Sequence, residues 1–343
     1  MSDTLLGSSV APLLKEPRCW LVTGAGGFIG SSLVEALLAN GQDVVGLDNF
    51  SSGHASNLAH VKAKVGSAFN RFRLIEDDIR NPDACREAMA GVDVVLHQAA
   101  IASVPLSMEQ PLLVHDVNVT GFLTLLEAAR AVGVRRFVYA SSSAVYGDSE
   151  NFPQIEDRIG QPLSPYGATK RINEIYGHLY SSVFGLECVG LRYFNVYGPR
   201  QDPEGAYSAV LPRWIASMVA DEQVTIHGSS AISRDFCFID DVVQANIRAA
   251  TTSRAVAGQV FNIATGTEVS LAELFEAIRE TVNATGGDYR REPILGPARQ
   301  GDIVKSTADI AHARRGLEFS PEYRLNEGIV PTLAYYRSPQ GAK

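Results

Sequence analysis

Short apolar runs alternate with amphipathic stretches along the first 190 or so residues. The apolar runs predict strands at CWLVT (19–23), DVVGL (43–47), RFRLI (71–75), VDVVLH (92–97), RRFVYA (135–140) and ECVGL (187–191). Between them lie helical patterns such as 28–41 and 118–133, the second closed by a glycine. Strand–helix–strand units of this length predict an α/β fold with a doubly wound, Rossmann-like parallel sheet and right-handed crossovers.

This alternation ends after Asn195. Residues 198–235 are rich in Gly, Pro and Ser, whereas 234–250 and VFNIA (260–264) look like further helix and strand. A helix is predicted over 270–285, before a loop-rich tail. We interpret this half as a smaller C-terminal substrate-binding domain, interleaved with the last strands of the sheet. The predicted boundaries are 1–194 with about 236–264 for the Rossmann-like domain, and about 195–235 with 265–343 for the smaller one.

Composition narrows the class of protein. The chain has 343 residues, 45% of them hydrophobic, which is enough for a large core and for two domains. The net charge of -8, without a basic face, argues against nucleic acid as a partner. The apolar runs are too broken for a membrane span, and the first residues do not resemble a secretory signal. Four scattered cysteines (Cys19, Cys85, Cys188, Cys237) fit small apolar positions in or near core strands, so a cytoplasmic location is expected.

A glycine triplet directly follows the first predicted strand. Gly24, Gly27 and Gly30 stand in TGAGGFIGS, where the next helix begins. Glycine lets the backbone turn sharply and approach a pyrophosphate, whose charge is favoured by the free N–H groups and the dipole of a helix start. Asp48 ends the second strand, where a carboxylate accepts hydrogen bonds from a ribose diol and repels a 2′-phosphate. The glycines alone fit an ordinary tight turn, but with Asp48 they predict a site for NAD rather than NADP.

Residues after the third and fourth strands fit the same cleft. Asp78 and Ile79 offer an acceptor and an apolar wall to an adenine, although a helix cap or turn explains Asp78 equally well. The run Gln98-Ala99-Ala100 keeps small side chains where bulk would block a cofactor. Asn118 opens the next long helix and is expected to brace the end of the fourth strand.

Two polar groups suggest acid–base chemistry. Tyr166 and Lys170 are spaced i, i+4 on a helix that Ser164-Pro165 would start, so they share one helix face. A nearby ammonium stabilises a phenolate, so the pKa of Tyr166, about 10 in a model peptide, is expected to be tuned toward neutrality. Ser141-Ser142-Ser143 ends the fifth strand, where hydroxyls face the ligand crevice of such a sheet. By themselves, chance explains the Tyr–Lys spacing and a polar turn explains the serines.

These motifs occur in a recognisable order. TGAGGFIGS, Asp48, DDIR, HQAA, YASSSAVYG, PYGATK and LRYFNVYGPR resemble the extended short-chain dehydrogenase/reductase family over most of the chain. Within it, the chain is most similar to bacterial UDP-N-acetylglucosamine 4-epimerases, through SSS before YGD and through SRDFC-I and R-GD---S-AD. The resemblance implies a tightly bound NAD and a homodimer built on helices 110–132 and 165–184. The predicted cofactor-binding residues are Gly24, Gly27, Phe28, Ile29, Gly30, Asp48, Asn49, Ser52, Gly53, Asp78, Ile79, Gln98, Ala99, Ala100, Asn118, Tyr166, Lys170, Tyr193 and Val196.

By position, the resemblance makes Ser142, Tyr166 and Lys170 the catalytic triad, with Ser143 as a second hydroxyl near the sugar. Tyr166 would take the proton of the C4 hydroxyl while C4 gives its hydride to NAD, and Lys170 would hold the ribose. The 4-keto sugar would then turn over and take the hydride back on its other face. Related dehydratases carry Asp-Glu after the catalytic serine or threonine; this chain has Ser143-Ala144 there, so the reaction is expected to stop at epimerisation.

The nucleotide end of the substrate is expected to be held firmly, because only the sugar rotates. The resemblance implies substrate contacts at Ser103, Ser142, Ser143, Asn195, Ala209, Val210, Arg234, Arg299, Asp302 and Ser306. An arginine fork suits phosphate oxygens, although a surface salt bridge is the alternative for Arg234. The chain departs from the similar enzymes at GSSAIS (228–233), and at Thr225 and His227, where Tyr and Asn are expected near the uracil.

The residue at position 306 indicates which sugar the chain acts on. Galactose epimerases carry a tyrosine at the matching place, which walls the C2 side of the pocket; a serine leaves space for an N-acetyl group, for which Ser103 and Ser143 offer donors. The expected reaction is therefore the interconversion of UDP-N-acetylglucosamine and UDP-N-acetylgalactosamine, without a metal. The alternative for Ser306 is a plain surface loop position. The alternatives for the chain are a 4-epimerase of a UDP-uronic acid (UDP-glucuronate or an N-acetylated uronate) and a catalytically silent NAD-binding sensor.

Overall fold

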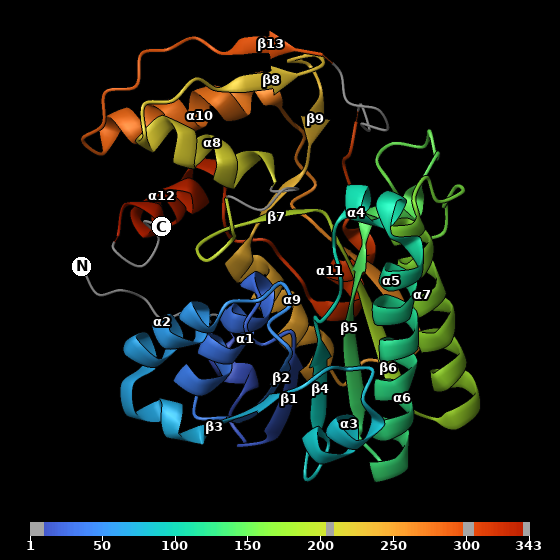
Figure 1. Cartoon of the computed structure of the whole chain (residues 1–343). Coiled ribbons are helices and arrows are strands. Elements are labelled where there is room, and N and C mark those ends of the chain that lie inside the picture. The colour runs from blue at the N-terminus through green and yellow to red at the C-terminus, as the bar shows by residue number, and fades with distance from the viewer. Residues whose placement is uncertain (1–9, 204–208, 298–304, 339–343) are drawn as a thin grey trace.

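The computed structural model describes residues 10–203, 209–297 and 305–338, and its centre is a seven-stranded parallel sheet (Figure 1). The strand order is β11-β6-β5-β4-β1-β2-β3, which confirms the doubly wound sheet predicted from the sequence. The bounds are β1 (Cys19–Thr23), β2 (Asp43–Asp48), β3 (Phe72–Glu76), β4 (Val94–His97), β5 (Arg136–Ser142), β6 (Glu187–Tyr193) and β11 (Val260–Ile263). All six strands predicted between residues 19 and 191 are present, with ends within two residues of the expected ones.

Helices cover both faces of the sheet (Figure 1). One face packs against α1 (Phe28–Ala39), α2 (Ala55–Val65) and α9 (Ile239–Thr251). The other packs against α3 (Pro82–Ala88), α6 (Gly121–Val132) and α7 (Pro165–Phe184). Each layer buries its own apolar cluster against the strands, which explains why these strands are apolar on both sides. The shorter turns are η1 (Ala11–Leu13), η2 (Gly66–Arg71), α4 (Val104–Glu109) and η4 (Ser143–Tyr146).

The helix predicted to open at residue 118 begins earlier. It starts at Pro111 as α5 (Pro111–His115), passes through one π-helical turn, η3 (Asp116–Thr120), and continues as α6. Gly133, with φ of 74°, ends it in a left-handed cap, as the sequence suggested. Among the described residues, only this run (111–132) has the length and hydropathy of a membrane span; half of it is buried in the molecule, so the feature alone is weak evidence for a membrane helix.

The second half of the chain forms a cap of small elements at one end of the sheet (Figure 1). The predicted helices appear as α9 and as α10 (Leu271–Ala284). Three helices were not predicted: α8 (Val210–Val219), in the segment rich in Gly, Pro and Ser, and the tail helices α11 (Ala311–Leu317) and α12 (Leu325–Arg337). Three two-stranded pairs complete this part: β7 (Asn195–Tyr197) with β10 (Phe236–Phe238), β8 (Thr225–His227) with β13 (Ile294–Gly296), and β9 (Ser233–Arg234) with β12 (Val269–Ser270).

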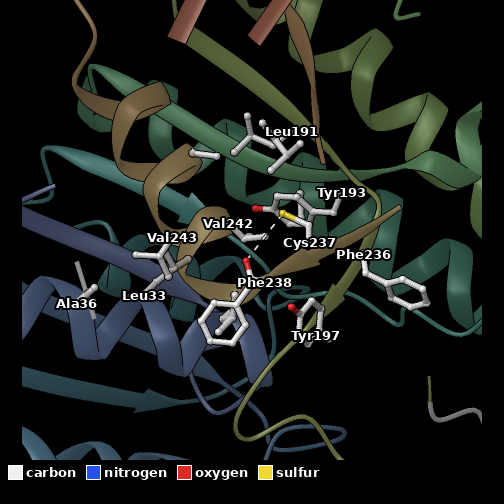
Figure 2. Close-up of a cluster of buried hydrophobic side chains, with 14 of the residues drawn as sticks. Leu33, Ala36, Leu191, Tyr193, Tyr197, Phe236, Cys237, Phe238, Val242 and Val243 are labelled. Carbon is white, nitrogen blue, oxygen red and sulfur yellow. Dashed lines mark hydrogen bonds between the residues drawn. The ribbon is translucent and has the colours of Figure 1, made fainter. Parts of the chain in front are cut away.

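One buried cluster joins the two halves (Figure 2). Leu33 of α1, Tyr193 of β6 and Tyr197 of β7 surround Cys237 and Phe238 of β10. Because β10 runs directly into α9, this packing ties the cap to the sheet. Three of the four thiols are buried, and none forms a disulfide; Cys85 lies on helix α3 rather than in a strand.

Candidate active site

A cavity of about 620 Å³ lies where the sheet strands end and the cap begins. Its sheet side is lined by residues at the carboxyl ends of β1 to β6, which is where ligands bind in doubly wound sheets. Its cap side includes Trp214 of α8, Thr225 of β8 and Arg234 of β9. Of the predicted cofactor residues, all except Asn118 line this one cavity.

The glycine loop is built for close approach. Gly24 has φ of 68°, a conformation that disfavours other residues, and a Cβ on Gly30 would lie 1.9 Å from the Gly24 carbonyl oxygen. Asp48 holds the loop: its carboxylate accepts from the Gly26 N–H at 2.8 Å and from the Phe50 N–H at 2.7 Å. A carboxylate has further lone pairs, so Asp48 can still accept hydrogen bonds from a ribose. The loop therefore fits a dinucleotide, and NAD bound there would supply a hydride acceptor.

Asp78 combines the two roles considered for it. It lines the cavity, but its carboxylate also accepts from the Arg80 side chain at 2.8 and 2.9 Å and from the Asn49 amide at 2.8 Å. The hydrogen bonds from Arg80 lower the pKa of Asp78 to about 2. The group is thus an ionised acceptor at neutral pH, held in a turn at the edge of the cavity.

Gln98 and Tyr193 belong to a closed hydrogen-bond ring. The Tyr193 hydroxyl donates to Gln98 Oε1 at 3.1 Å and accepts from Asn246 Nδ2 at 2.8 Å. Gln98 Nε2 donates to Asn246 Oδ1 at 3.1 Å. Asn246 was not predicted, since it is only one of several polar residues along the helix α9. Its role is visible only in the folded chain, where it fixes two cavity-lining side chains.

Asn118 stands behind the cavity. It is buried, accepts from the Ile101 N–H at 2.8 Å and donates to the Ile101 carbonyl at 3.0 Å and to Thr169 Oγ1 at 3.2 Å. The predicted bracing of the chain after β4 is confirmed. The residue does so from within the π-helical turn rather than from the start of a helix. A direct contact with the cofactor stays a prediction.

The proposed catalytic groups meet at one end of the cavity. Ser164 Oγ caps α7 by accepting from the Gly167 N–H at 3.1 Å, which places Tyr166 and Lys170 in the first two turns. Ser142 is the last residue of β5, and its hydroxyl accepts from the Ala144 N–H at 3.1 Å. Tyr166, Lys170 and Ser142 all line the cavity. The i, i+4 spacing placed Tyr166 and Lys170 on one helix face, and the family resemblance implied that Ser142 joins them; their catalytic roles stay a prediction.

The electrostatics of this end differ from the expectation. Burial raises the pKa of Tyr166, and the Ser142 hydroxyl only partly opposes the rise. Burial also lowers the pKa of Lys170 to about 8. The Lys170 Nζ donates to the Ala140 carbonyl at 2.9 Å and lies 5.9 Å from the centre of the Tyr166 ring. The predicted shift of Tyr166 toward neutrality is therefore not produced by Lys170 within the chain, because desolvation outweighs an ammonium directed elsewhere.

Comparison with known proteins identifies the family. The family model described as "NAD dependent epimerase/dehydratase family" matches residues 20–264. The chain belongs to this family. A UDP-glucose 4-epimerase from Mycolicibacterium smegmatis is 40% identical over 320 residues, 93% of this chain and 98% of that one.

Solved structures agree with this family. A UDP-N-acetylglucosamine 4-epimerase from Methanobrevibacter ruminantium, in complex with UDP-N-acetylmuramic acid, is 33% identical with a TM-score of 0.85, over 94% of this chain and 98% of that one. A UDP-glucuronic acid 4-epimerase from Bacillus cereus, in complex with UDP-glucuronic acid and NAD, is 32% identical with a TM-score of 0.82, over 92% and 98%. NAD is accordingly the cofactor of this epimerase/dehydratase family member.

The substrate end of this epimerase/dehydratase site is only partly assembled from the predicted residues. Asn195, Ala209, Val210 and Arg234 line the cavity, together with Arg213 and Gln201, which were not predicted. Arg234 Nη1 also donates to the Ser233 carbonyl at 2.8 Å. Thr225 and His227, the two departures from the similar enzymes, line the cavity at its cap side.

Among the described residues, three predicted substrate residues, Ser103, Ser143 and Ser306, do not line the cavity. Ser103 caps α4, accepting from the Leu106 N–H at 3.0 Å, and Ser143 begins the turn η4. Ser306 is 5% exposed and lies outside the cavity wall among the described residues. Arg299 and Asp302 lie outside the described residues. In the part of the chain that the structure describes, no group of three or more His, Cys, Asp or Glu side chains is arranged to hold a metal.

Proposed function

We propose that this chain is an NAD-dependent UDP-sugar 4-epimerase whose substrate pair is UDP-N-acetylglucosamine and UDP-N-acetylgalactosamine. The observation that carries the proposal is that Ser142, Tyr166 and Lys170 line the same cavity as the Gly24–Gly30 loop and Asp48. A hydroxyl-bearing sugar carbon next to these groups would find a base, a hydrogen-bond relay and a hydride acceptor together.

The chain's own residues divide the chemistry as follows. Tyr166 reacts as the phenolate, after its own proton has left to solvent: it takes the proton of the C4 hydroxyl, and the hydroxyl so formed returns that proton after the keto sugar has turned over. Ser142 passes the hydrogen bond between the two hydroxyls. Lys170 carries a buried positive charge that becomes paired when the Tyr166 hydroxyl ionises, which favours the phenolate at the moment it forms. Arg234 is proposed to hold the diphosphate, so that only the sugar rotates.

The proposed preference for an N-acetylated sugar is supported by a solved 4-epimerase of UDP-N-acetylglucosamine that is 33% identical over 94% of this chain. Ser306 is buried and small but does not line the cavity, so its contact with the C2 side of the sugar stays a prediction. A relative named UDP-glucose 4-epimerase is 40% identical, and a solved UDP-glucuronic acid 4-epimerase is 32% identical. Overall identity therefore does not select the sugar, and an experiment must separate the candidates.

The deciding experiment is incubation with a panel of UDP-sugars, followed by NMR at C4. Interconversion of UDP-N-acetylglucosamine and UDP-N-acetylgalactosamine, faster than that of UDP-glucose or UDP-glucuronic acid, is expected. The ultraviolet spectrum of the purified protein should show bound NAD, with a trace of NADH after addition of substrate. Preference for a uronate would replace the sugar assignment, and NAD binding without any turnover would indicate a silent sensor.

We propose further that the chain acts in the cytoplasm as a homodimer. The support is a face of exposed apolar side chains on α4, α5 and α7, formed by Val104, Met108, Leu112, Leu113, Ile175, Leu179 and Val183. The cofactor domain is proposed to comprise 1–194 and about 236–264, and the substrate domain about 195–235 and 265–343. The site residues named above are proposed in the roles given to them.

A further inference from the structure

A buried carboxylate stands behind the catalytic groups. Glu174 follows Tyr166 and Lys170 on the same face of α7, at steps of four residues, and is 3% exposed. Arg192 of β6 donates to both of its oxygens, from Nε at 2.7 Å and from Nη2 at 3.0 Å. The Ser141 hydroxyl of β5 donates to Oε1 at 2.7 Å. One side chain therefore bonds two strands to the catalytic helix.

The partners of Glu174 stand next to cavity-lining groups. Ser141 directly precedes Ser142, and Arg192 directly precedes Tyr193. The sheet register pairs Ser141 with Arg192 and Ser142 with Tyr193. A shift of α7 along the sheet would break these bonds, so the carboxylate sets the position of the helix against both strand ends.

Stability alone does not require this arrangement. A buried ion pair contributes little net stability compared with apolar side chains of the same volume, because both charges lose their water. It does impose a specific geometry, since two forked hydrogen bonds are satisfied in only one arrangement. Proton transfer needs such geometry, because a displacement of about 1 Å can cost on the order of 100-fold in rate.

We infer that Glu174 is a positioning residue, which holds the Ser142 and Tyr166 hydroxyls at hydrogen-bond distance from one substrate hydroxyl. The inference rests on the proposed epimerase function. It adds a role for a residue that touches neither substrate nor cofactor. It also gives the buried pair Glu174–Arg192 a purpose beyond folding.

The chain contains a matched control pair. Glu35 of α1 and Arg200 are equally buried and bond at 2.5 Å. Each buried glutamate also has a second, more exposed cation, Lys64 at 2.8 Å for Glu35 and Arg171 at 3.0 Å for Glu174. Neither Glu35 nor Arg200 adjoins a proposed catalytic residue. Removing this control carboxylate therefore reproduces the loss of a buried ion pair without disturbing the catalytic end.

The experiment compares Glu174→Gln with Glu35→Gln in the holoenzyme. Melting temperature, bound NAD, kcat and KM are measured with the sugar nucleotide that the wild type prefers. Both variants should melt earlier. Glu174→Gln should lose about 10- to 100-fold in kcat with KM changed by less than about twofold and NAD retained, whereas Glu35→Gln should keep kcat within about twofold. Equal kcat losses in the two folded variants, or an unchanged kcat in Glu174→Gln, would overturn the inference.

Two further variants keep the test decisive if Glu174→Gln does not fold. The apolar pair Glu174→Leu/Arg192→Met leaves no buried charge unpaired, because the other partner of Glu174, Arg171, is partly exposed to water. It should melt near the wild type, yet lose about tenfold or more in kcat. Full kcat in this variant would again refute positioning. Ser141→Ala should lower kcat more mildly, and combined with Glu174→Gln it should add nothing, because both act through one contact; additive losses would contradict this. A wild type that epimerises no UDP-sugar would refute the proposed function instead, so the two failures are distinguishable.

Discussion

Tyr166 illustrates how a single buried residue can be poised by its surroundings. Burial raises its pKa, so the hydroxyl is protonated in the chain alone and must lose that proton to solvent before it can accept the proton of a substrate hydroxyl. Lys170 can stabilise the phenolate, because its ammonium is buried and donates only to the Ala140 carbonyl among the hydrogen bonds described. In the empty site, burial thus opposes ionisation of Tyr166 and also opposes the charge on Lys170, so the phenolate–ammonium pair is expected to form when the cavity is filled.

Replacing Tyr166 by Phe tests the base directly. Folding and NAD content should be unchanged, because the ring keeps its packing. Turnover should fall by roughly 10²- to 10⁴-fold, the usual contribution of a general base. The measurement is kcat together with the nucleotide released on denaturation. Turnover within about a factor of two of the wild type would remove Tyr166 from the mechanism.

Lys170→Met tests the depressed pKa of about 8. Between pH 8 and the ordinary value of 10.5, the unfolded chain binds more protons at this lysine than the folded chain, so wild-type stability rises with pH across that window. Below it the burial of the charge costs on the order of 3 kcal/mol, a cost that Met does not carry. The free energy of unfolding is measured by urea titration of nucleotide-free protein at pH 7.5 and at pH 10. From the lower to the higher pH, the stability of the wild type should rise relative to that of the variant.

Lys62→Met, at an exposed lysine, is the control: it measures how the loss of any one positive charge affects stability. Lys62 lies exposed on α2, so replacing it takes away one positive charge without removing a buried one. A difference between wild type and Lys170→Met that stays constant from pH 7.5 to 10 would show that the lysine is not held at a lowered pKa.

Ser306→Tyr tests the choice of sugar. Ser306 does not line the cavity in this structure, so the variant asks whether the residue borders the sugar when substrate is bound. If it does, a tyrosine should fill the volume that an acetamido group needs, and activity on UDP-N-acetylglucosamine should fall at least about tenfold more than activity on UDP-glucose, equivalent to about 1–3 kcal/mol of packing strain. UDP-glucose serves as the internal control for folding. An equal loss on both substrates would mean that this buried residue supports its loop, and equal retention would place it far from the sugar.

At the scale of elements, the loop between β1 and α1 makes the cofactor site. A Cβ at Gly30 would lie 1.9 Å from the Gly24 carbonyl oxygen, and relieving this clash requires the backbone of the loop to move. Gly30→Ala should therefore distort the loop, weaken NAD binding and lose the cofactor during purification. The control is Gly41→Asn at the other end of the same helix, where φ is 71° and nothing lies within 4 Å. Bound NAD per chain, measured after denaturation, should drop only for Gly30→Ala.

Elements defined by local patterns were predictable, and those defined by contacts were not. The strands of the sheet and the start of α7 follow from apolar runs and from the Ser164-Pro165 cap. Helix α8 has apolar residues at helical spacing over 210–219, but Pro212 and the Gly/Pro-rich flanks obscured that signal. The two- and three-residue strands of the cap exist only because partners from distant segments pair with them.

The same division holds within the site. Gly24, Asp48, Tyr166 and Lys170 stand at spacings that one chemistry requires, so the sequence indicates them. Asn246 and the Glu174–Arg192 pair carry no such spacing, because their partners are far away in the chain. The direction of the Tyr166 pKa was also beyond the sequence, since burial is a property of the whole fold.

For the whole molecule, the remaining question is what covers the apolar face of α4, α5 and α7. Ile175, Leu179 and Val183 recur every four residues along α7 and are 54%, 41% and 61% exposed, and Leu112 on α5 is 85% exposed. Exposed apolar side chains that form one face over these three helices suit pairing with a second copy of the chain. Light scattering at micromolar concentration should therefore give the mass of a dimer.

Charge placed on this face should separate the copies. Leu112→Glu combined with Val183→Glu buries two carboxylates in the proposed interface, so the variant should be monomeric. It should keep its NAD, because neither residue lines the cofactor cavity. Leu295→Glu on β13 is the matched control, since that leucine is 70% exposed but lies on the cap, and this variant should remain a dimer. A wild type that is already monomeric, or a control that dissociates as readily as the double variant, would show that the face has another purpose.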